Sequence, residues 1–171
     1  MTQPESPFLK KATRPSGVRA LVGLLLILWL TASGAACAGE SEARTIVQVT
    51  AKGEVFQAVL VETPREQARG LGGRKALAPN EGMLFLYPTK SGLSFWMKDM
   101  LISIDMIWLD NTQVVHIESS VPFPAPGTPD KMLPVYSSPT PANGVLEIAA
   151  GRVAEIGLKV GDKVQITFGQ Q

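Results

Sequence analysis

The sequence predicts a mainly β domain: a compact antiparallel β-sandwich or barrel of jelly-roll type with one or two short helices. Three observations support this fold class. Roughly eight short segments rich in β-branched and aromatic residues recur along the chain, turn residues separate them, and no strand–helix–strand rhythm indicates a parallel sheet.

The N-terminal residues predict an export signal. A flank with four Lys and Arg residues precedes an apolar run from Ala20 to Leu30, and small residues follow it. This order is typical of a secretory signal peptide. The run is shorter than the about 20 apolar residues that a permanent membrane span needs. We therefore expect a signal peptide over residues 1–37, a tether over residues 38–44 and a single β-rich domain over residues 45–169.

Cys37, the single cysteine, lies where the signal would be cleaved. The segment Gly34-Ala35-Ala36-Cys37 resembles a lipoprotein box, in which the cysteine becomes the lipidated first residue. Alternatively, ordinary cleavage after Ala38 discards the cysteine. In both cases the mature domain lacks a cysteine nucleophile, a disulfide and a Cys-containing zinc site. The expected location is the periplasm, or a membrane to which a lipid at Cys37 anchors the domain.

The charge of the mature part restricts the partners. Residues 38–171 carry 12 Lys and Arg against 14 Asp and Glu, a net charge of −2, without a basic run. This balance argues against nucleic acid and against an electrostatic membrane surface. We expect the partner to be a small ligand or an envelope protein, and membrane contact only through the signal or a lipid anchor.

The first elements have clear local signals. Residues 45–51 and 55–62 are rich in β-branched residues and are joined by a Lys-Gly-Glu turn, which predicts a hairpin. Thr63 can then cap a short helix, because Pro64 suits its first position and Glu66 follows the cap by three residues. Glycines at positions 70, 72 and 73 end this helix.

The remaining strands are expected to be short. Asp110-Asn111 is a turn signal between two of them. Six prolines between residues 123 and 143 exclude a central strand and predict a long ordered loop. Residues 151–157 could form one or two helical turns. The expected strands cover residues 82–87, 93–98, 102–109, 113–121, 145–149 and 164–168.

Several short motifs occur in order along the predicted domain. They are Arg69-Gly70-Leu71, Glu81-Gly82-Met83-Leu84-Phe85, Phe95-Trp96-Met97-Lys98, Ile104-Asp105-Met106-Ile107 and Gly161-Asp162-Lys163-Val164. Together they resemble the domain of unknown function 192 family. The resemblance covers nearly all of Thr45 to Phe168, and it implies a compact β-sandwich of jelly-roll type, often behind an export signal, with no assigned activity. One departure is Gly72-Gly73, where the family usually has Met and Phe.

The FWMK segment, Phe95 to Lys98, is the first candidate binding surface. As a strand end it places Trp96 and Lys98 on one face, an aromatic platform beside a cation. Alternatively, its apolar residues are core and Lys98 snorkels past them. Arg69 and Arg74 beside the glycine-rich turn could bind a carboxylate or phosphate, or could be solvated charges. The candidate ligand-binding residues are therefore Trp96, Lys98, Arg69 and Arg74.

Asp105 interrupts an otherwise apolar strand. A buried carboxylate costs several kcal/mol unless it is paired, so a partner among Lys98, Arg69 and Arg74 is expected. A catalytic interpretation would use Asp105 with Asp99 or Glu81 as general acid and base. The ion pair is favoured over catalysis, because no nucleophile or third catalytic member is evident.

We expect neither a metal nor a cofactor. His116, the sole histidine, cannot build a His-rich site alone. It could form a soft Cu(I) site with Met97, Met100, Met106 or Met83, but methionines usually fill gaps in a core. The leading interpretation is a non-catalytic exported module that binds a small ligand or a partner protein near the FWMK loop and the arginines. The alternatives are an envelope hydrolase and a structural scaffold.

Overall fold

The structure is a computed structural model that describes residues 44–169. Within this range no helix is long and apolar enough to cross a membrane. The strands are β1 (Ile46–Ala51), β2 (Glu54–Val61), β3 (Glu81–Ser91), β4 (Ser94–Trp96), β5 (Ile104–Asp110), β6 (Gln113–Val121), β7 (Val135–Ser137), β8 (Ala142–Ala149) and β9 (Gln165–Phe168). The helices are α1 (Pro64–Arg69), α2 (Arg152–Ile156) and the 3-10 turn η1 (Asp130–Met132).

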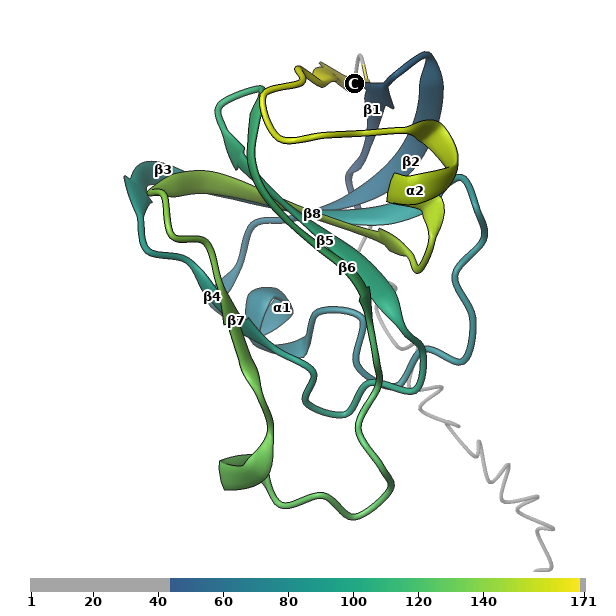
Figure 1. The fold of residues 1–171 in the computed structure, drawn as a ribbon, viewed down its shortest axis with the longest axis vertical. Coiled ribbons are helices and arrows are strands. Elements are labelled where there is room, and N and C mark those ends of the chain that lie inside the picture. The colour runs from purple at the N-terminus through teal and green to yellow at the C-terminus, as the bar shows by residue number, and fades with distance from the viewer. Residues whose placement is uncertain (1–43, 170–171) are drawn as a thin grey trace, which may run out of the picture. The chain divides into compact units, whose positions relative to one another are not determined.

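Seven strands form one mixed sheet in the order β6-β5-β8-β3-β2-β1-β9, and β4 and β7 form a separate two-stranded ribbon (Figure 1). The prediction of a mainly β fold with short helices is confirmed. One pair, β2 with β3, is parallel, although every strand was expected to be antiparallel. Parallel neighbours need a crossover of a dozen or more residues, and α1 with the loop after it supplies one.

The large sheet curls so that its two ends approach each other without closing. β9 pairs with β1 at one end of the strand order, and the segment just before β9 reaches β6 at the other end. The Val114 N–H donates to the Asp162 carbonyl (2.8 Å), and the Gly161 N–H donates to the Val114 carbonyl (2.8 Å). These bonds occupy part of the free edge of β6.

The concave side of the sheet holds an aliphatic core. Alternate residues of the strands point into it, as the period of two in a strand requires. The helix α2 adds Val153, and the segment after it adds Leu158. The fully buried residues of this inner core include Val47, Val49, Phe56, Ala58, Leu84, Ile107, Leu109, Leu146 and Ile148.

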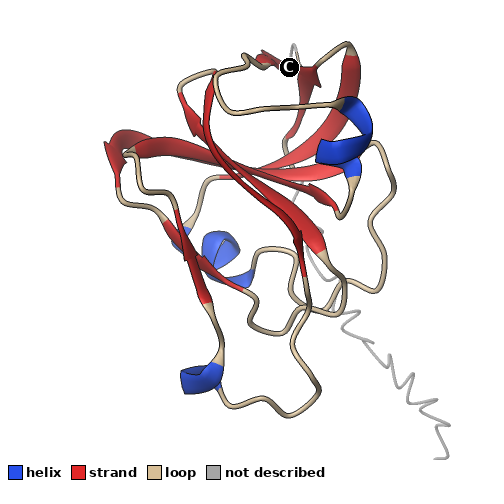
Figure 2. Cartoon of the chain, in the orientation of Figure 1, coloured by secondary structure: helices blue, strands red, loops and turns tan. Residues whose placement is uncertain are grey.

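The opposite side of the sheet carries a second core, richer in aromatic residues and methionine. The β4–β7 ribbon lies below the sheet in Figure 2, and residues from β4 and the loops around it contribute to this outer core. Its members include Leu71, Met83, Phe85, Leu93, Met97, Met100, Met106, Trp108 and Val145. The candidate binding residues lie around this outer core.

Candidate functional site

The β4–β7 ribbon is fixed to the sheet through Phe95. Its ring makes edge-to-face contacts with Phe85 (centroids 5.0 Å apart) and with Trp108 (6.2 Å). Such aromatic pairs favour a specific ring geometry, and they contribute free energy in addition to that gained from the apolar area they bury. β4 is therefore packed on the sheet by one side chain while its next residue, Trp96, points the other way.

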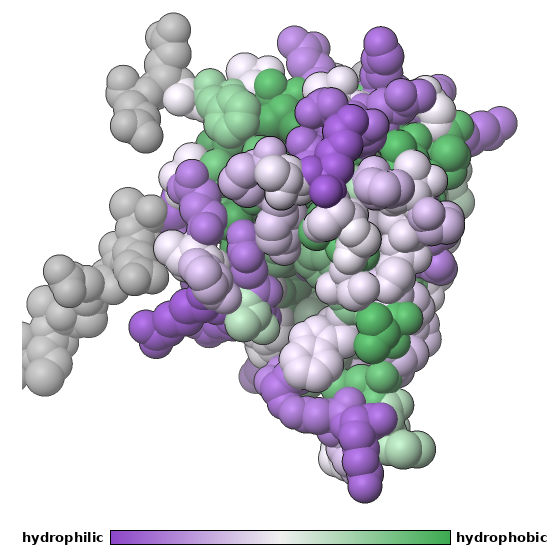
Figure 3. All heavy atoms as spheres, turned by 90° about the vertical axis from the view of Figure 1, so that its left-hand side faces the viewer, coloured by the Kyte–Doolittle hydropathy of each residue, from purple (hydrophilic) through white to green (hydrophobic). Residues whose placement is uncertain are grey.

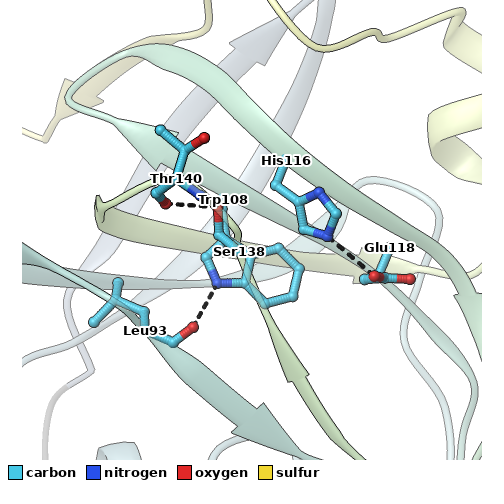
Figure 4. Close-up of polar contacts among 6 residues, drawn as sticks. All are labelled: Leu93, Trp108, His116, Glu118, Ser138 and Thr140. Atoms are coloured by element: carbon cyan, nitrogen blue, oxygen red, sulfur yellow. Dashed lines mark hydrogen bonds and ion pairs between the residues drawn. The ribbon is translucent and has the colours of Figure 1, made fainter.

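Figure 4 shows polar contacts near the ribbon, and one of them reinforces this attachment. The buried Trp108 indole donates to the Leu93 carbonyl, one residue before β4, at 3.1 Å. The ring of His116 lies 5.2 Å from that of Trp108, and its Nε2 lies 3.0 Å from Glu118 Oε1. In the connection between β7 and β8, Ser138 Oγ donates to the Thr140 carbonyl at 2.7 Å. The start of the ribbon is thus anchored at its backbone as well as by Phe95.

The outer side of the ribbon exposes apolar side chains. Trp96 and Val135 are register partners across β4 and β7 and are 46% and 63% exposed, and Met132 in η1 is 68% exposed. Apolar side chains gather with charged ones in the lower part of the surface in Figure 3, where the ribbon lies. We call Trp96, Val135, Met132, Lys98 and Asp130 the ribbon face.

Lys98 belongs to this face and is already paired. Its Nζ lies 5.6 Å from the centroid of the Trp96 ring and donates a hydrogen bond to the Asp130 carboxylate. That hydrogen bond is the main reason why the pKa of Lys98 is raised. The predicted neighbourhood of Trp96 and Lys98 is therefore present, with Asp130 as a partner that the sequence did not indicate.

The predicted arginines do not join the ribbon face. Arg69 lies exposed in the last turn of α1, and Arg74 lies beside Glu81, with NH1 3.6 Å from Oε2. The glycine turn contacts the FWMK loop through its backbone, where the Gly73 N–H donates to the Asp99 carbonyl at 2.8 Å, and Leu71 packs in the same core as Met97. The single site expected from the sequence is thus divided into two surfaces.

The second surface is a groove outside strands β1, β2 and β3, with a volume of about 340 Å³. Strand pairing brings its members together, since Ile46 is opposite Val59 and Gln57 is opposite Glu81. We call it the arginine groove, lined by Arg44, Ile46, Gln57, Val59, Arg74, Glu81 and Gly82.

Asp105 is fully buried, as expected, but none of its predicted cationic partners binds it. Its Oδ1 accepts the N–H groups of Ser120 (2.7 Å) and Gly151 (3.1 Å), and its Oδ2 accepts that of Val153 (2.7 Å). The predicted ion pair with Lys98, Arg69 or Arg74 is therefore wrong. Three backbone donors compensate the carboxylate at a bulge of β6 and at the start of α2.

The other two weak catalytic candidates, Asp99 and Glu81, make contacts that do not involve Asp105. Asp99 is exposed with φ of 57°, and its carbonyl holds the glycine turn. Glu81 accepts the Ala78 N–H at 3.2 Å and lies beside Arg74. Because Asp105 has no exposed surface, it cannot face a substrate together with either of them.

Glu147 is a buried carboxyl that the sequence reasoning missed. It lies on β8 between Met83 of β3 and Met106 of β5, is 5% exposed, and its Oε2 has no hydrogen-bond partner in the described structure. Desolvation raises its pKa to about 8. No sequence signal marks it, because a Glu that alternates with Leu146 and Ile148 is typical of the solvent side of a strand.

Comparison with protein-family models gives one match, which covers most of the chain. The model of the domain of unknown function 192 (DUF192), described as an uncharacterised ACR, matches residues 46–166. The chain belongs to this family. The suspected family is confirmed, and its function is uncharacterised.

Two solved structures share the fold of this DUF192 protein. A protein of unknown function from Novosphingobium aromaticivorans DSM 12444 is 33% identical, with a TM-score of 0.62 over 70% of this chain and 83% of that chain. A protein described as a proposed transcription regulator from Sinorhizobium meliloti 1021 is 26% identical, with the same TM-score over 72% and 94% of the two chains. The comparison with curated proteins finds no match.

The family match contains the whole ribbon face and all of the arginine groove except Arg44. Cys37 and the expected signal and tether lie outside the described residues, apart from Arg44 at the end of the tether. Among residues 44–169, no three His, Cys, Asp or Glu side chains are grouped so that they could hold a metal ion.

Proposed function

We propose that this DUF192 protein is a non-catalytic binding module whose ribbon face binds an apolar segment of a partner protein. The observation that carries the proposal is the rigid display of Trp96. Its neighbour Phe95 is packed among Phe85 and Trp108, while Trp96 itself is 46% exposed beside Val135. Large aromatic side chains held in this way are typical of the residues that dominate binding energy in protein interfaces.

The charges of the ribbon face indicate the chemistry of the partner. Lys98 and Asp130 neutralise each other, so the centre of the face has no uncompensated charge from this pair. Three apolar side chains remain for contact, namely Trp96, Val135 and Met132. A neutral, apolar protein segment complements such a face better than a polyanion or a strongly charged peptide.

The proposal also includes export. The basic flank, the apolar run from Ala20 to Leu30 and the small residues after it support an envelope location. The partner would then be an envelope protein, and Cys37 would be either lipidated or removed with the signal.

Two other functions fit the molecule less well. A hydrolase that uses Asp105 would need that carboxyl at a surface, and it is fully buried. A DNA-binding role, which the description of the Sinorhizobium meliloti protein would suggest, needs a basic surface. Residues 44–169 carry 12 Lys and Arg and 12 Asp and Glu, which does not favour binding to a polyanion.

A site-specific crosslinking experiment tests the proposal. A photoreactive amino acid replaces Val135 in the full-length chain, expressed in its own host, and a matched protein carries it at Val160, which is 60% exposed elsewhere. We expect position 135 to crosslink to a different protein of the host. This crosslink should be absent at position 160 and should be lost when Trp96→Ala is added. Equal crosslinking at both positions, or crosslinking only to a second copy of the chain, would contradict the proposal.

Affinity measurements then quantify the contribution of Trp96 to partner binding. With the crosslinked partner purified, calorimetry should show that Trp96→Ala weakens binding by about 30-fold or more, because truncating a hot-spot residue costs at least about 2 kcal/mol. Val160→Ala should bind as the wild type does. Unchanged binding by a folded Trp96→Ala protein would remove the ribbon face from the interaction.

A further inference from the structure

The arginine groove has the composition of a small-ligand site. Its volume of about 340 Å³ is within the range of pockets that bind small molecules. Two apolar side chains, Ile46 and Val59, are opposite each other on β1 and β2 and form part of its wall. Ile46 is 45% exposed, so the groove leaves apolar surface open to solvent.

Polar groups with a net positive charge also line the groove. Arg44 and Arg74 bring two guanidinium groups, Gln57 brings an amide, and Glu81 brings the one carboxylate. The formal charge of the lining side chains is therefore +1. Arg44 also lies near Glu66, whose pKa is lowered mainly by hydrogen bonds from Thr63 and to a smaller extent by this arginine.

Arg74 is positioned by Glu81 and keeps donors for another group. The contact between them is a single one of 3.6 Å from NH1 to Oε2, and the Arg74 side chain is 30% exposed. Glu81 is itself held by the Ala78 N–H. A guanidinium has five N–H donors, so one long contact leaves most of them available to an acceptor in the groove.

We propose that the arginine groove binds a small organic monocarboxylate. The carboxylate accepts hydrogen bonds from Arg74 and Arg44, and the hydrocarbon part of the ligand lies against Ile46 and Val59. A planar carboxylate suits the forked donors of arginine, and a single negative charge matches the +1 charge of the lining. A phosphate or a nucleotide would bring more charge than this lining balances and would leave the apolar wall unused.

This site is independent of the ribbon face. The groove is built on β1, β2 and β3, whereas the ribbon face is built on β4, β7 and η1. Failure of one proposal therefore does not affect the other. The variant Trp96→Ala, which should weaken partner binding, should bind a carboxylate as the wild type does.

The test uses benzoate and octanoate as probes of the full chain, with benzamide as an uncharged control of the same shape. Binding is followed by calorimetry and by shifts of the backbone NMR signals of residues 46, 57, 59 and 82. We expect saturable binding of the carboxylates that weakens at least tenfold in Arg74→Gln and is unchanged in Arg69→Gln. Arg69 is the matched control, because it is an exposed arginine of α1 outside the groove.

Four outcomes would overturn the proposal. The first is no saturable binding of either carboxylate, and the second is equal affinity in Arg74→Gln and in the wild type. The third is equal affinity for benzamide and benzoate, which would exclude recognition of the charge. The fourth is tighter binding of inorganic phosphate than of the carboxylates. Unfolding curves of both arginine variants show whether a loss of binding comes from a loss of fold.

Discussion

Asp105 and Glu147 are two buried carboxyl groups on neighbouring central strands, and their hydrogen-bonding environments are opposite. Asp105 of β5 points to the inner side of the sheet and accepts three backbone N–H groups. Glu147 of β8 is one register step away and points to the outer side, where its Oε2 has no partner in the described structure. The first carboxyl group has three hydrogen-bond donors around it, whereas desolvation raises the pKa of the second to about 8.

The difference shows what a buried acid requires. A carboxylate in a core needs donors, but these do not have to come from arginine or lysine. At Asp105 they come from the chain where it leaves regular structure, at the bulge before Val121 and at the first residues of α2. At Glu147 all neighbours are regular strands, whose N–H groups are already used in the sheet, so no backbone donor is available.

Removing the Asp105 carboxylate should give the largest loss of stability. In Asp105→Ala three N–H groups lose their acceptor, and the one of Val153 is left in a buried position. Each unsatisfied buried donor costs about 1–3 kcal/mol, so we expect the free energy of unfolding to fall by about 4 kcal/mol or more. Urea unfolding followed by tryptophan fluorescence measures the loss.

The matched control lies on the same strand. Asp110→Ala removes a more exposed carboxylate that pairs with Lys90, with Nζ 2.6 Å from Oδ1. Such pairs contribute less than about 1 kcal/mol, so this variant should remain close to the wild type in stability. Similar losses in the two variants would show that the backbone donors of Asp105 are readily satisfied by water.

The protonated state of Glu147 predicts a pH dependence of the opposite kind. Between the ordinary value of 4.5 and the folded-state pKa of about 8, the folded protein keeps a proton that the unfolded chain releases. The stability is therefore complete below pH 4.5, falls as the pH rises toward 8 and is constant above it. From pH 5 to 7.5 the free energy of unfolding should drop by about 3 kcal/mol.

The variant Glu147→Gln removes this titration and should make the same pH range nearly flat. Glu54→Gln, which changes an exposed Glu of β2, should keep the slope of the wild type. Urea unfolding at a series of pH values provides the comparison. A flat profile for the wild type would mean that Glu147 ionises in the fold near its ordinary pKa.

The sequence predicted the elements with strong local signals. The hairpin of β1 and β2 and the capping box of α1 are present, because turn residues and capping side chains act within a few positions of the chain. The alternation of the FWMK segment was also correct, since Met97 is buried and Trp96 is exposed. The parallel pair of β2 and β3 was missed, because pairing between strands 20 residues or more apart has no local signal.

The candidate site was predicted only in part for the same reason. Trp96 and Lys98 are neighbours within one segment, and the structure places them together. Arg74 was expected beside them, but it lines the arginine groove with Glu81 and with Arg44, a residue far from it in sequence. The donors of Asp105 could not be foreseen either, because they depend on a bulge and on a left-handed residue, Ser120, that no sequence pattern marks.

Ser120 allows the smallest and most specific change around Asp105. Its φ of 54° is unfavourable for a residue with a side chain, and its N–H donates to Asp105 at 2.7 Å. Ser120→Gly keeps the N–H and removes a backbone strain of roughly 1 kcal/mol, part of which the greater freedom of glycine in the unfolded chain offsets. We expect a net gain of about 0.5 kcal/mol in the free energy of unfolding.

The control is Ser119→Gly, at the preceding residue of β6. Ser119 lacks the positive φ, so this variant should instead lose about 0.5 kcal/mol in the same urea titration. If both variants lost stability equally, the positive φ of Ser120 would not be a strain that glycine relieves.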